Sequence, residues 1–333
     1  MTQFRTKILA MGSNHPEKKL TNFDLEKMVD TNHEWIVERT GISERRISDR
    51  RKGELPSDMA AKATRQALDK ANLNADEIDL IIYATNTPDN NLPNSAVQLQ
   101  QKLGITNQCP AFDLTAACSG FVYGMSMADN LIKAGAYKKI LVVGTEMLSN
   151  MVNWSDRSTC ILFGDGAGVA VVGRASEGES SEILATKLGS DGSGKESLWI
   201  PNGGCAKPIT EENVNDPDRY IQMVGQDIFK WAVRTLAKCA KTVLEDAGKT
   251  LADVDWFIPH QANMRIIQAA AKRLDIPQEK VIINIERFGN TSAATIPTAM
   301  DEAIEDGRIR RGDLILIDAF GAGLTYGASL LVY

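Results

Sequence analysis

Cys118 is the residue of this sequence whose setting most clearly suggests chemistry. It lies in the segment Asp113-Leu-Thr-Ala-Ala-Cys-Ser-Gly120, where an apolar, strand-like run ends near Leu114 and helical character extends from Gly120 to Ala134. A cysteine at such a turn meets the unpaired N–H groups and the positive end of a helix, which favour thiolate over thiol. Because the thiolate is the nucleophile, this placement predicts acyl-transfer chemistry. The alternative is a buried structural cysteine, which is common in intracellular proteins.

Two other segments could supply partners for this thiol. His260 lies in Pro-His-Gln-Ala-Asn, and Asn290 lies in Gly-Asn-Thr-Ser-Ala-Ala. Each side chain can offer an N–H to an oxygen that gains negative charge. The chain has only two other histidines, His15 and His33, and both lie in polar N-terminal segments. His260 alone could be a hydrogen-bonded core histidine, but its occurrence with Cys118 and Asn290 favours a catalytic role.

Length and composition exclude several classes of function. A chain of 333 residues that is 43% hydrophobic can bury a sizeable core, as one large domain or as two fused halves. The formal net charge of −6 argues against wrapping of nucleic acid and against a basic, membrane-binding surface. No segment is apolar enough to span a membrane. The five cysteines are scattered, without a C-x-x-C pair or a grouping with histidine, so we expect no metal site and a reducing, cytoplasmic location. They are Cys109, Cys118, Cys160, Cys205 and Cys239.

An internal repeat indicates the architecture. The segment Ala75–Tyr83 recurs in character as Leu251–Ile258, and an amphipathic helix precedes each copy. We predict these helices over Pro56–Asn72 and Asp227–Gly248. The apolar positions of the second helix recur at helical spacing; they are Phe229, Val233, Leu236 and Ala240.

Each copy of the repeat is followed by a second predicted helix and then by a short apolar strand. The distance from Asp79 to Val142 is 63 positions, and that from Asp255 to Leu316 is 61. Apolar strands that alternate with helices imply parallel sheets buried on both faces. We therefore predict an α/β protein with five layers, α/β/α/β/α, made of two duplicated halves, residues 1–173 and 174–333. Cys118 and His260 then fall at strand ends, where ligands of such sheets bind.

Five motifs together carry a resemblance to a known family that spans essentially the whole chain. The chain resembles the β-ketoacyl-[acyl-carrier-protein] synthase III family, the condensing enzymes that start bacterial type II fatty acid synthesis. This resemblance implies the thiolase fold and a homodimer. The motifs are Asp30-Thr-Asn-His-Glu-Trp-Ile-Val-Glu-Arg-Thr-Gly-Ile42, Ala116-Ala-Cys-Ser-Gly-Phe121, Pro259-His-Gln-Ala-Asn263, Gly289-Asn-Thr-Ser-Ala-Ala294 and Phe320-Gly-Ala-Gly-Leu-Thr-Tyr-Gly327.

The resemblance implies a reaction in two half-reactions without metal or cofactor. Cys118 would take an acyl group from an acyl-CoA, which is a substrate, while the backbone N–H groups of Cys118 and Ala322 hold the oxyanion. Malonyl-carrier protein would then lose carbon dioxide, with its thioester oxygen held by His260 and Asn290, and condense with the acyl group. By the same resemblance, elongating enzymes of this fold have a Cys-His-His arrangement, and Asn290 stands where their second histidine would be.

The resemblance also implies residues that bind the substrates. Trp35 and Arg157 would sandwich the CoA adenine, because an indole face and a planar guanidinium suit stacking. Thr31 and Arg39 would meet the phosphate-bearing end, and Asn263 the pantetheine amides. Gln226 stands where some relatives have asparagine. The alternatives are an ordinary anchoring role for Trp35 and solvated charges or ion pairs for the arginines.

Two further groups of residues follow from the resemblance. Leu92 lies in the loop Thr87–Pro93, which would cross the dimer interface and close the acyl pocket of the partner subunit; the alternative is a simple interface contact. We therefore predict short primers, from acetyl to about four carbons. A basic patch would dock the acidic acyl carrier protein, or else be a solvated helix face. The other predicted pocket residues are Leu148, Phe163, Leu198 and Phe320, and the patch is Lys230, Arg265, Lys272 and Arg273.

The sequence thus predicts an acyltransferase that condenses a short acyl-CoA, in first place acetyl-CoA, with malonyl-acyl-carrier protein to initiate fatty acid synthesis. One alternative is a related starter or condensing enzyme of secondary metabolism, of quinolone or polyketide type. Another, of a different class, is a scaffold without activity that binds CoA or carrier protein.

Overall fold

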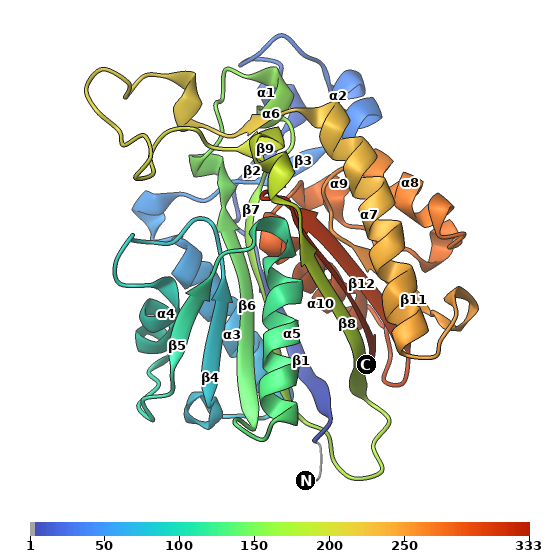
Figure 1. Cartoon of the computed structure of the whole chain (residues 1–333). Helices are drawn as coiled ribbons and strands as arrows, with labels where there is room; N and C mark the ends of the chain where they lie inside the picture. The colour runs from blue at the N-terminus through green and yellow to red at the C-terminus, as the bar shows by residue number, and fades with distance from the viewer. Residues whose placement is uncertain (1–3) are drawn as a thin grey trace.

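The first of the two large β-sheets has five strands, in the order β1 (Thr6–Asn14), β7 (Asp165–Arg174), β6 (Lys139–Met147), β4 (Leu80–Ala84) and β5 (Ala111–Leu114). The computed structural model describes residues 4–333 (Figure 1). β4 pairs in parallel with β5 and β6, while β7 and β1 are added as antiparallel strands. β4 is buried along its whole length, as expected of a strand that is covered on both faces.

The second sheet has four strands, in the order β11 (Trp256–Pro259), β12 (Leu314–Gly321), β13 (Thr325–Val332) and β8 (Glu182–Ser190). Only β11 and β12 run parallel. Both sheets are therefore mixed, and the prediction of parallel sheets is correct only for β6, β4 and β5 in the first sheet and for β11 and β12 in the second. The reason lies partly in loop length, because residues 322–324 alone join β12 to β13. So short a connection can join antiparallel strands but cannot make a parallel crossover.

Helices form three layers around the two sheets, which gives the predicted five-layer thiolase-like fold. α5 (Gly120–Lys133) and α10 (Thr295–Glu305) contact strands of both sheets and lie between them (Figure 1). α3 (Pro56–Ala71) and α4 (Ser95–Leu103) cover the outer face of the first sheet. α7 (Gly225–Asp246) packs on the outer face of the second sheet and on α8 (Met264–Arg273).

Local sequence explains where the predicted helices begin and end. α3 starts with Pro56 in its first turn, and the Asp58 carboxylate accepts a hydrogen bond from the Leu55 N–H at 3.1 Å. It ends at Asn72, which has a φ of 54° and so takes the left-handed conformation typical of helix ends. The second predicted helix is α7, which begins two residues before the predicted start and ends two before the predicted end.

The two halves are alike, but the connections are longer than the single helix predicted after each repeat. The chain passes through α4, β5 and α5 between β4 and β6, and through α8, α9 (Ile285–Phe288) and α10 between β11 and β12. An isolated parallel bridge between Phe257 and Val281 takes the place that β5 has in the first half. The first sheet ends with β7 at Arg174, and the second starts with β8 at Glu182. The division at 173/174 stays a prediction.

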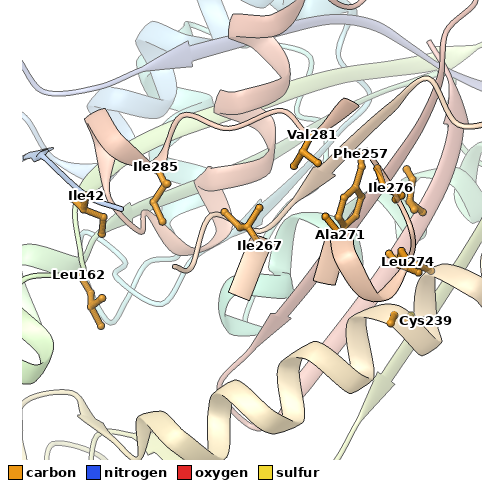
Figure 2. Packing of buried hydrophobic residues seen from close by; sticks show 14 of the residues in the cluster. Ile42, Leu162, Cys239, Phe257, Ile267, Ala271, Leu274, Ile276, Val281 and Ile285 are labelled. Atoms are coloured by element: carbon orange, nitrogen blue, oxygen red, sulfur yellow. The ribbon is translucent and has the colours of Figure 1, made fainter. Parts of the chain in front are cut away.

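Apolar side chains fill the spaces between the layers. Figure 2 shows one such cluster, in which Ile267 and Ala271 of α8 gather with Phe257 of β11 and Cys239 of α7. A cap of short elements lies over the end of the sheets where the site is found. It comprises β2 (Lys19–Thr21), α1 (Asn22–Leu25), α2 (His33–Thr40), β3 (Glu44–Arg46), α6 (Arg157–Cys160), β9 (Leu198–Trp199) and β10 (Gln222–Met223).

Candidate active site

The structure brings Cys118, His260 and Asn290 together on the wall of one cavity of about 540 Å³. Cys118 lies in a 3-10 turn between β5 and α5, and His260 follows β11 directly. Asn290 follows α9 and forms an isolated bridge with Phe163. Two of the three residues therefore come from the ends of parallel strands in different sheets, which is where a ligand of such a fold binds.

The end of β12 presses against the turn that carries the thiol. A Cβ atom on Gly321 would lie 2.5 Å from the Cys118 nitrogen and 2.9 Å from the Ala117 Cβ, so only glycine fits here. Ala117 itself has a φ of 47°, a conformation rare for residues other than glycine. Ala322 follows Gly321 and lines a second cavity together with Cys118. The backbone just before Ala322 thus packs against the backbone of Cys118, the other residue predicted to form the oxyanion hole.

Burial opposes the predicted preference for thiolate at Cys118. Burial raises the pKa of the Cys118 thiol from its ordinary 9.0 to about 12, opposed by a hydrogen bond from Ser292 and reinforced by the charge of Glu146. At 1.36 kcal/mol per pKa unit, this rise corresponds to about 4 kcal/mol. A helix N-terminus supplies about 0.3–1 kcal/mol, and at most about 2. Burial therefore opposes the thiolate more strongly than the helix terminus favours it.

His260 is a buried, neutral imidazole. Its Nδ1 lies 2.7 Å from the Thr295 hydroxyl, and its ring meets the Phe320 ring edge-on at a centroid distance of 5.6 Å. Burial lowers the pKa of His260 to about 3. Among residues 4–333 the other ring nitrogen, Nε2, has no hydrogen-bond partner. The ring lines the cavity of about 540 Å³, which we call the large cavity. Nε2 is therefore the ring atom that can meet a ligand.

Hydrogen bonds also fix the orientation of the Asn290 side chain. Its Oδ1 accepts a hydrogen bond from the Ser292 N–H at 2.8 Å, which identifies this atom as the oxygen because the partner can only donate. The Asn290 amide nitrogen then remains for the cavity that the residue lines. Two N–H donors, from His260 and Asn290, can thus converge on one ligand oxygen.

Glu146, which sequence reasoning missed, is buried beside this set. Its carboxylate accepts hydrogen bonds from the Ser292 hydroxyl at 3.1 Å, from the Thr87 hydroxyl at 2.7 Å and from the Asn86 amide at 2.9 Å. It therefore joins the loop after β4 to the segment that carries Asn290. The signal in the sequence is an acidic residue that only Gly144 and Thr145 separate from the apolar run Ile140–Val143 of β6.

We expect Glu146 to make stability depend on pH. Burial raises its pKa from 4.5 to about 7 against the hydrogen bonds from Thr87, Asn86 and Ser292. A carboxyl whose pKa is raised on folding stabilises fully below pH 4.5, and this contribution is lost as pH rises through 7. Relative to Glu146→Gln, the free energy of unfolding of the wild type should fall by about 3 kcal/mol between these values. Denaturant titrations of both proteins across this range test it, and parallel curves would contradict it.

The predicted adenine-binding pair is present, but in direct contact. The Arg157 guanidinium lies 4.9 Å from the centre of the Trp35 ring and donates a hydrogen bond to the Asp30 carbonyl at 2.8 Å. A base stacked between two planes needs about 7 Å, twice the usual carbon contact distance. The expected sandwich is therefore closed in this structure, and an adenine could enter only after Arg157 has moved.

The other residues predicted to bind CoA lie around the entrance. Arg39 and Gln226 line the large cavity, as does Asn263. The Asn263 side chain is already engaged, since its Oδ1 accepts from the Arg265 N–H at 2.9 Å and its Nδ2 donates to the Arg39 carbonyl at 3.1 Å. The buried Thr31 hydroxyl has no hydrogen-bond partner among the residues that the structure describes.

Two of the four predicted docking residues, Lys230 and Arg265, line the same cavity and are exposed. Lys272 and Arg273 lie in the last turn of α8, are exposed and do not line it. The predicted basic patch thus divides into two residues at the entrance and two away from it.

A second, smaller cavity of about 200 Å³ extends from Cys118 into an apolar region. Leu148, Phe163 and Leu198 line it as predicted. Phe320 lines the large cavity instead, and Leu92 is 87% exposed and lines neither cavity within this chain. Sequence reasoning missed the rest of the apolar wall, because much of it comes from the irregular segments after β6 and around β9 and β10. These residues are Met151, Trp199, Ile200 and Ile221.

Two negative findings concern residues 4–333. No three His, Cys, Asp or Glu side chains are grouped there in a way that could hold a metal ion. None of the helices described is long and apolar enough to cross a membrane. The absence of a cofactor stays a prediction.

A thiolase-like fold with a cysteine, a histidine and an asparagine on one cavity defines the class of condensing enzymes. Comparison with known proteins identifies the family. Residues 112–192 match 3-oxoacyl-[acyl-carrier-protein (ACP)] synthase III, and residues 244–333 match its C-terminal part. The chain is 50% identical over 97% of its length to the β-ketoacyl-[acyl-carrier-protein] synthase III of Caldanaerobacter subterraneus subsp. tengcongensis, covering 96% of that protein. It belongs to the β-ketoacyl-[acyl-carrier-protein] synthase III family and is an acyltransferase of fatty acid synthesis.

Solved structures agree with this assignment. The 3-oxoacyl-[acyl-carrier-protein] synthase III of Aquifex aeolicus VF5 superposes with a TM-score of 0.91 at 49% identity, covering 98% of this chain and 100% of that one. The priming β-ketosynthase of the R1128 polyketide pathway superposes with a TM-score of 0.90 at 35% identity, covering 99% and 97%. The predicted fold is thus confirmed.

Proposed function

We propose that the chain condenses a short acyl-CoA with malonyl-acyl-carrier protein through an acyl group carried on Cys118. The observation that carries this proposal is the meeting of Cys118, His260 and Asn290 on one cavity, with an apolar cavity beyond the thiol. The large cavity has room for the pantetheine arm common to both substrates, and the small one for the acyl chain.

In the first half-reaction, Cys118 loses its proton and its sulfur attacks the acyl-CoA carbonyl. The backbone N–H groups of Cys118 and Ala322 stabilise the oxyanion, and CoA leaves as a thiolate that takes up the proton. Because burial raises the pKa of Cys118, the proton must leave as the substrate enters. The small cavity of about 200 Å³ corresponds to about seven water molecules at about 30 Å³ each, which suits a short acyl chain.

In the second half-reaction, the malonyl thioester breaks its bond to the carboxylate and releases carbon dioxide. The electron pair moves toward the thioester oxygen, where His260 and Asn290 each donate an N–H. The resulting carbanion attacks the acyl carbon, and the Cys118 sulfur leaves as thiolate. A neutral His260 suits this role, because the step requires a donor but no net proton transfer.

A primer panel tests the choice of substrate. We expect acetyl-CoA and other acyl-CoAs of up to about four carbons to acylate the protein, as seen by intact-protein mass spectrometry. The structural similarity to a priming polyketide synthase supports a second candidate, a starter enzyme of secondary metabolism. Acylation by aryl- or long-acyl-CoA in place of acetyl-CoA would favour that candidate.

We further propose that the chain is a homodimer in which Leu92 enters the partner's acyl pocket. Leu92 is 87% exposed within a single chain, in a loop that Pro93 restrains. Such exposure of a large apolar side chain is expected where a second molecule covers it.

Leu92→Thr should shift the primer preference toward longer acyl-CoAs without abolishing acetyl transfer. One methylene that meets a closed wall changes discrimination by about 1–3 kcal/mol, so a shorter side chain should admit longer primers. The measurement is kcat/KM for a series of acyl-CoAs, with the dimer verified in solution. An unchanged chain-length profile in a dimeric variant would remove Leu92 from the pocket.

Arg265→Glu should lower the rate with malonyl-carrier protein and should reduce the dependence of that rate on salt. Acylation by acetyl-CoA should change less. The chain carries a net charge of −6, so an acidic partner needs a local basic patch, and Arg265 lines the cavity entrance. Lys272→Glu, the same charge change on the same helix but away from the cavity, is the matched control and should have a smaller effect. Equal losses in both half-reactions for Arg265→Glu would point instead to a role in CoA binding or folding.

A further inference from the structure

The hydroxyl group of Thr295 links two parts of the site. Thr295 is the first residue of α10 and is buried. Its Oγ1 lies 2.7 Å from Nδ1 of His260 and 2.9 Å from the Ser292 carbonyl oxygen. A hydroxyl has one proton and can donate it to only one of these two atoms.

The direction of this proton determines the tautomer of His260. If Thr295 donates to the Ser292 carbonyl, Nδ1 must carry a proton and donate it to Oγ1, and Nε2 is then a bare acceptor. If Thr295 donates to Nδ1, the imidazole proton lies on Nε2, which is the nitrogen available to the cavity. The two arrangements differ by the rotation of one hydroxyl and by the position of one imidazole proton.

The Ser292 carbonyl does not depend on the hydroxyl. The backbone N–H of Thr295 already donates to this oxygen at the end of its 3-10 turn. Among the residues described, Nδ1 of His260 has no hydrogen-bond partner other than the Thr295 hydroxyl. If Thr295 donates to Nδ1, the Thr295 hydroxyl, Nδ1 of His260 and the Ser292 carbonyl all still have a hydrogen-bond partner. The geometry therefore permits the tautomer of His260 with its proton on Nε2.

We propose that Thr295 is a positioning residue, whose hydroxyl donates to Nδ1 and thereby holds His260 in the tautomer with its proton on Nε2. The inference rests on the proposed role of His260 in decarboxylation. The oxygen of the malonyl thioester gains negative charge and can only accept, so a bare Nε2 would repel it. Protonation of both nitrogens is no substitute, since burial lowers the pKa of His260 to about 3.

Thr295→Val and Thr295→Ser form the test pair, because valine keeps the shape without the hydroxyl and serine restores it. We expect Thr295→Val to slow malonyl decarboxylation about tenfold, the effect of losing one supporting hydrogen bond, and Thr295→Ser to stay within about twofold of the wild type. Acylation by acetyl-CoA should remain within about twofold in both. His260→Ala, measured alongside, should lose about a hundredfold or more.

Nitrogen NMR of ring-¹⁵N-labelled histidine provides a readout that a purely structural role would not move. The chain has three histidines, and the signals absent from His260→Ala identify those of His260. In the wild type acetylated with acetyl-CoA, Nε2 should be protonated and Nδ1 bare. In Thr295→Val, the two signals should move toward a mixture of tautomers, and in Thr295→Ser they should not.

Two results would overturn the proposed role of Thr295 and leave the proposed role of His260 intact. One is a proton on Nδ1 with a bare Nε2 in the acetylated wild type. The other is wild-type decarboxylation by Thr295→Val while His260→Ala is strongly impaired. Normal decarboxylation by His260→Ala would instead reject the proposed function of His260, and the role of Thr295 with it.

Discussion

Cys118→Ala should abolish the covalent acyl-enzyme. Incubation of the wild type with acetyl-CoA should increase the mass of the chain by one acetyl group, and the variant should show no increase. The physical reason is position: of the five free cysteines, all within the described residues, Cys118 is the one that lines both cavities. Transfer to a carrier-bound malonyl unit should be lost in parallel, because no other thiol in the described part of the chain lines both cavities.

The remaining cysteines are the controls for this result. Single alanine variants should each keep the acetyl group, since three of these side chains are buried away from the site and one is exposed at the surface. Label that survives in Cys118→Ala would end the argument for this nucleophile. A wild type that binds acetyl-CoA but never acquires an acetyl group would favour a scaffold without activity. The four control positions are Cys109, Cys160, Cys205 and Cys239.

Sequence patterns predicted the elements of the fold well where one physical signal dominated. The apolar run Leu80–Ala84 forms a strand that is buried along its whole length, and Pro56 and Asn72 mark the two ends of α3. Strand direction was predicted less well, because a buried apolar strand has the same composition whether its neighbour runs parallel or antiparallel. The loop lengths of the folded chain decide that question.

The face of α7 shows how a functional surface can mislead a pattern. Phe229 and Val233 were predicted to belong to the apolar, core-facing side of this helix. Leu236 and Ala240 are buried as predicted, but in the first half of the helix the buried residues are Ile228 and Ala232, one position before Phe229 and Val233. Phe229 is exposed and lines the large cavity. An apolar residue at helical spacing can thus serve a ligand space as well as a core, and the sequence alone does not separate the two.

The site residues also divide into those that the sequence could identify and those that it could not. Cys118, His260 and Asn290 could be selected because their types and short motifs carry chemistry. Glu146 and Thr295 could not, because their importance depends on contacts between segments far apart in the chain, such as the 3.1 Å hydrogen bond from Ser292 to Glu146. The predicted preference of Cys118 for thiolate took no account of burial, which raises the pKa of its thiol. The helix terminus is visible in the sequence, but the degree of burial that outweighs it is not.

His260→Ala and Asn290→Ala should separate the two half-reactions. Both variants should still be acylated by acetyl-CoA at nearly the wild-type rate, because in the proposed mechanism the backbone N–H groups of Cys118 and Ala322 hold the first oxyanion. Decarboxylation of malonyl-carrier protein should fall by about two orders of magnitude or more in each, the effect of removing one oxyanion donor. Release of carbon dioxide and acylation, measured separately, give the two rates.

The effects of the two substitutions on decarboxylation should also be strongly non-additive. In the proposed mechanism His260 and Asn290 act on the same oxygen, so the double variant should lose less than the product of the two single effects. His33→Ala is the matched control: its ring stacks on Phe23 at a centroid distance of 4.8 Å, it does not line the large cavity, and both rates should stay normal. If His260→Ala and Asn290→Ala decarboxylate malonyl-carrier protein at the wild-type rate, their assignment as oxyanion donors is wrong, because no other side-chain N–H is held toward that oxygen in the proposed mechanism.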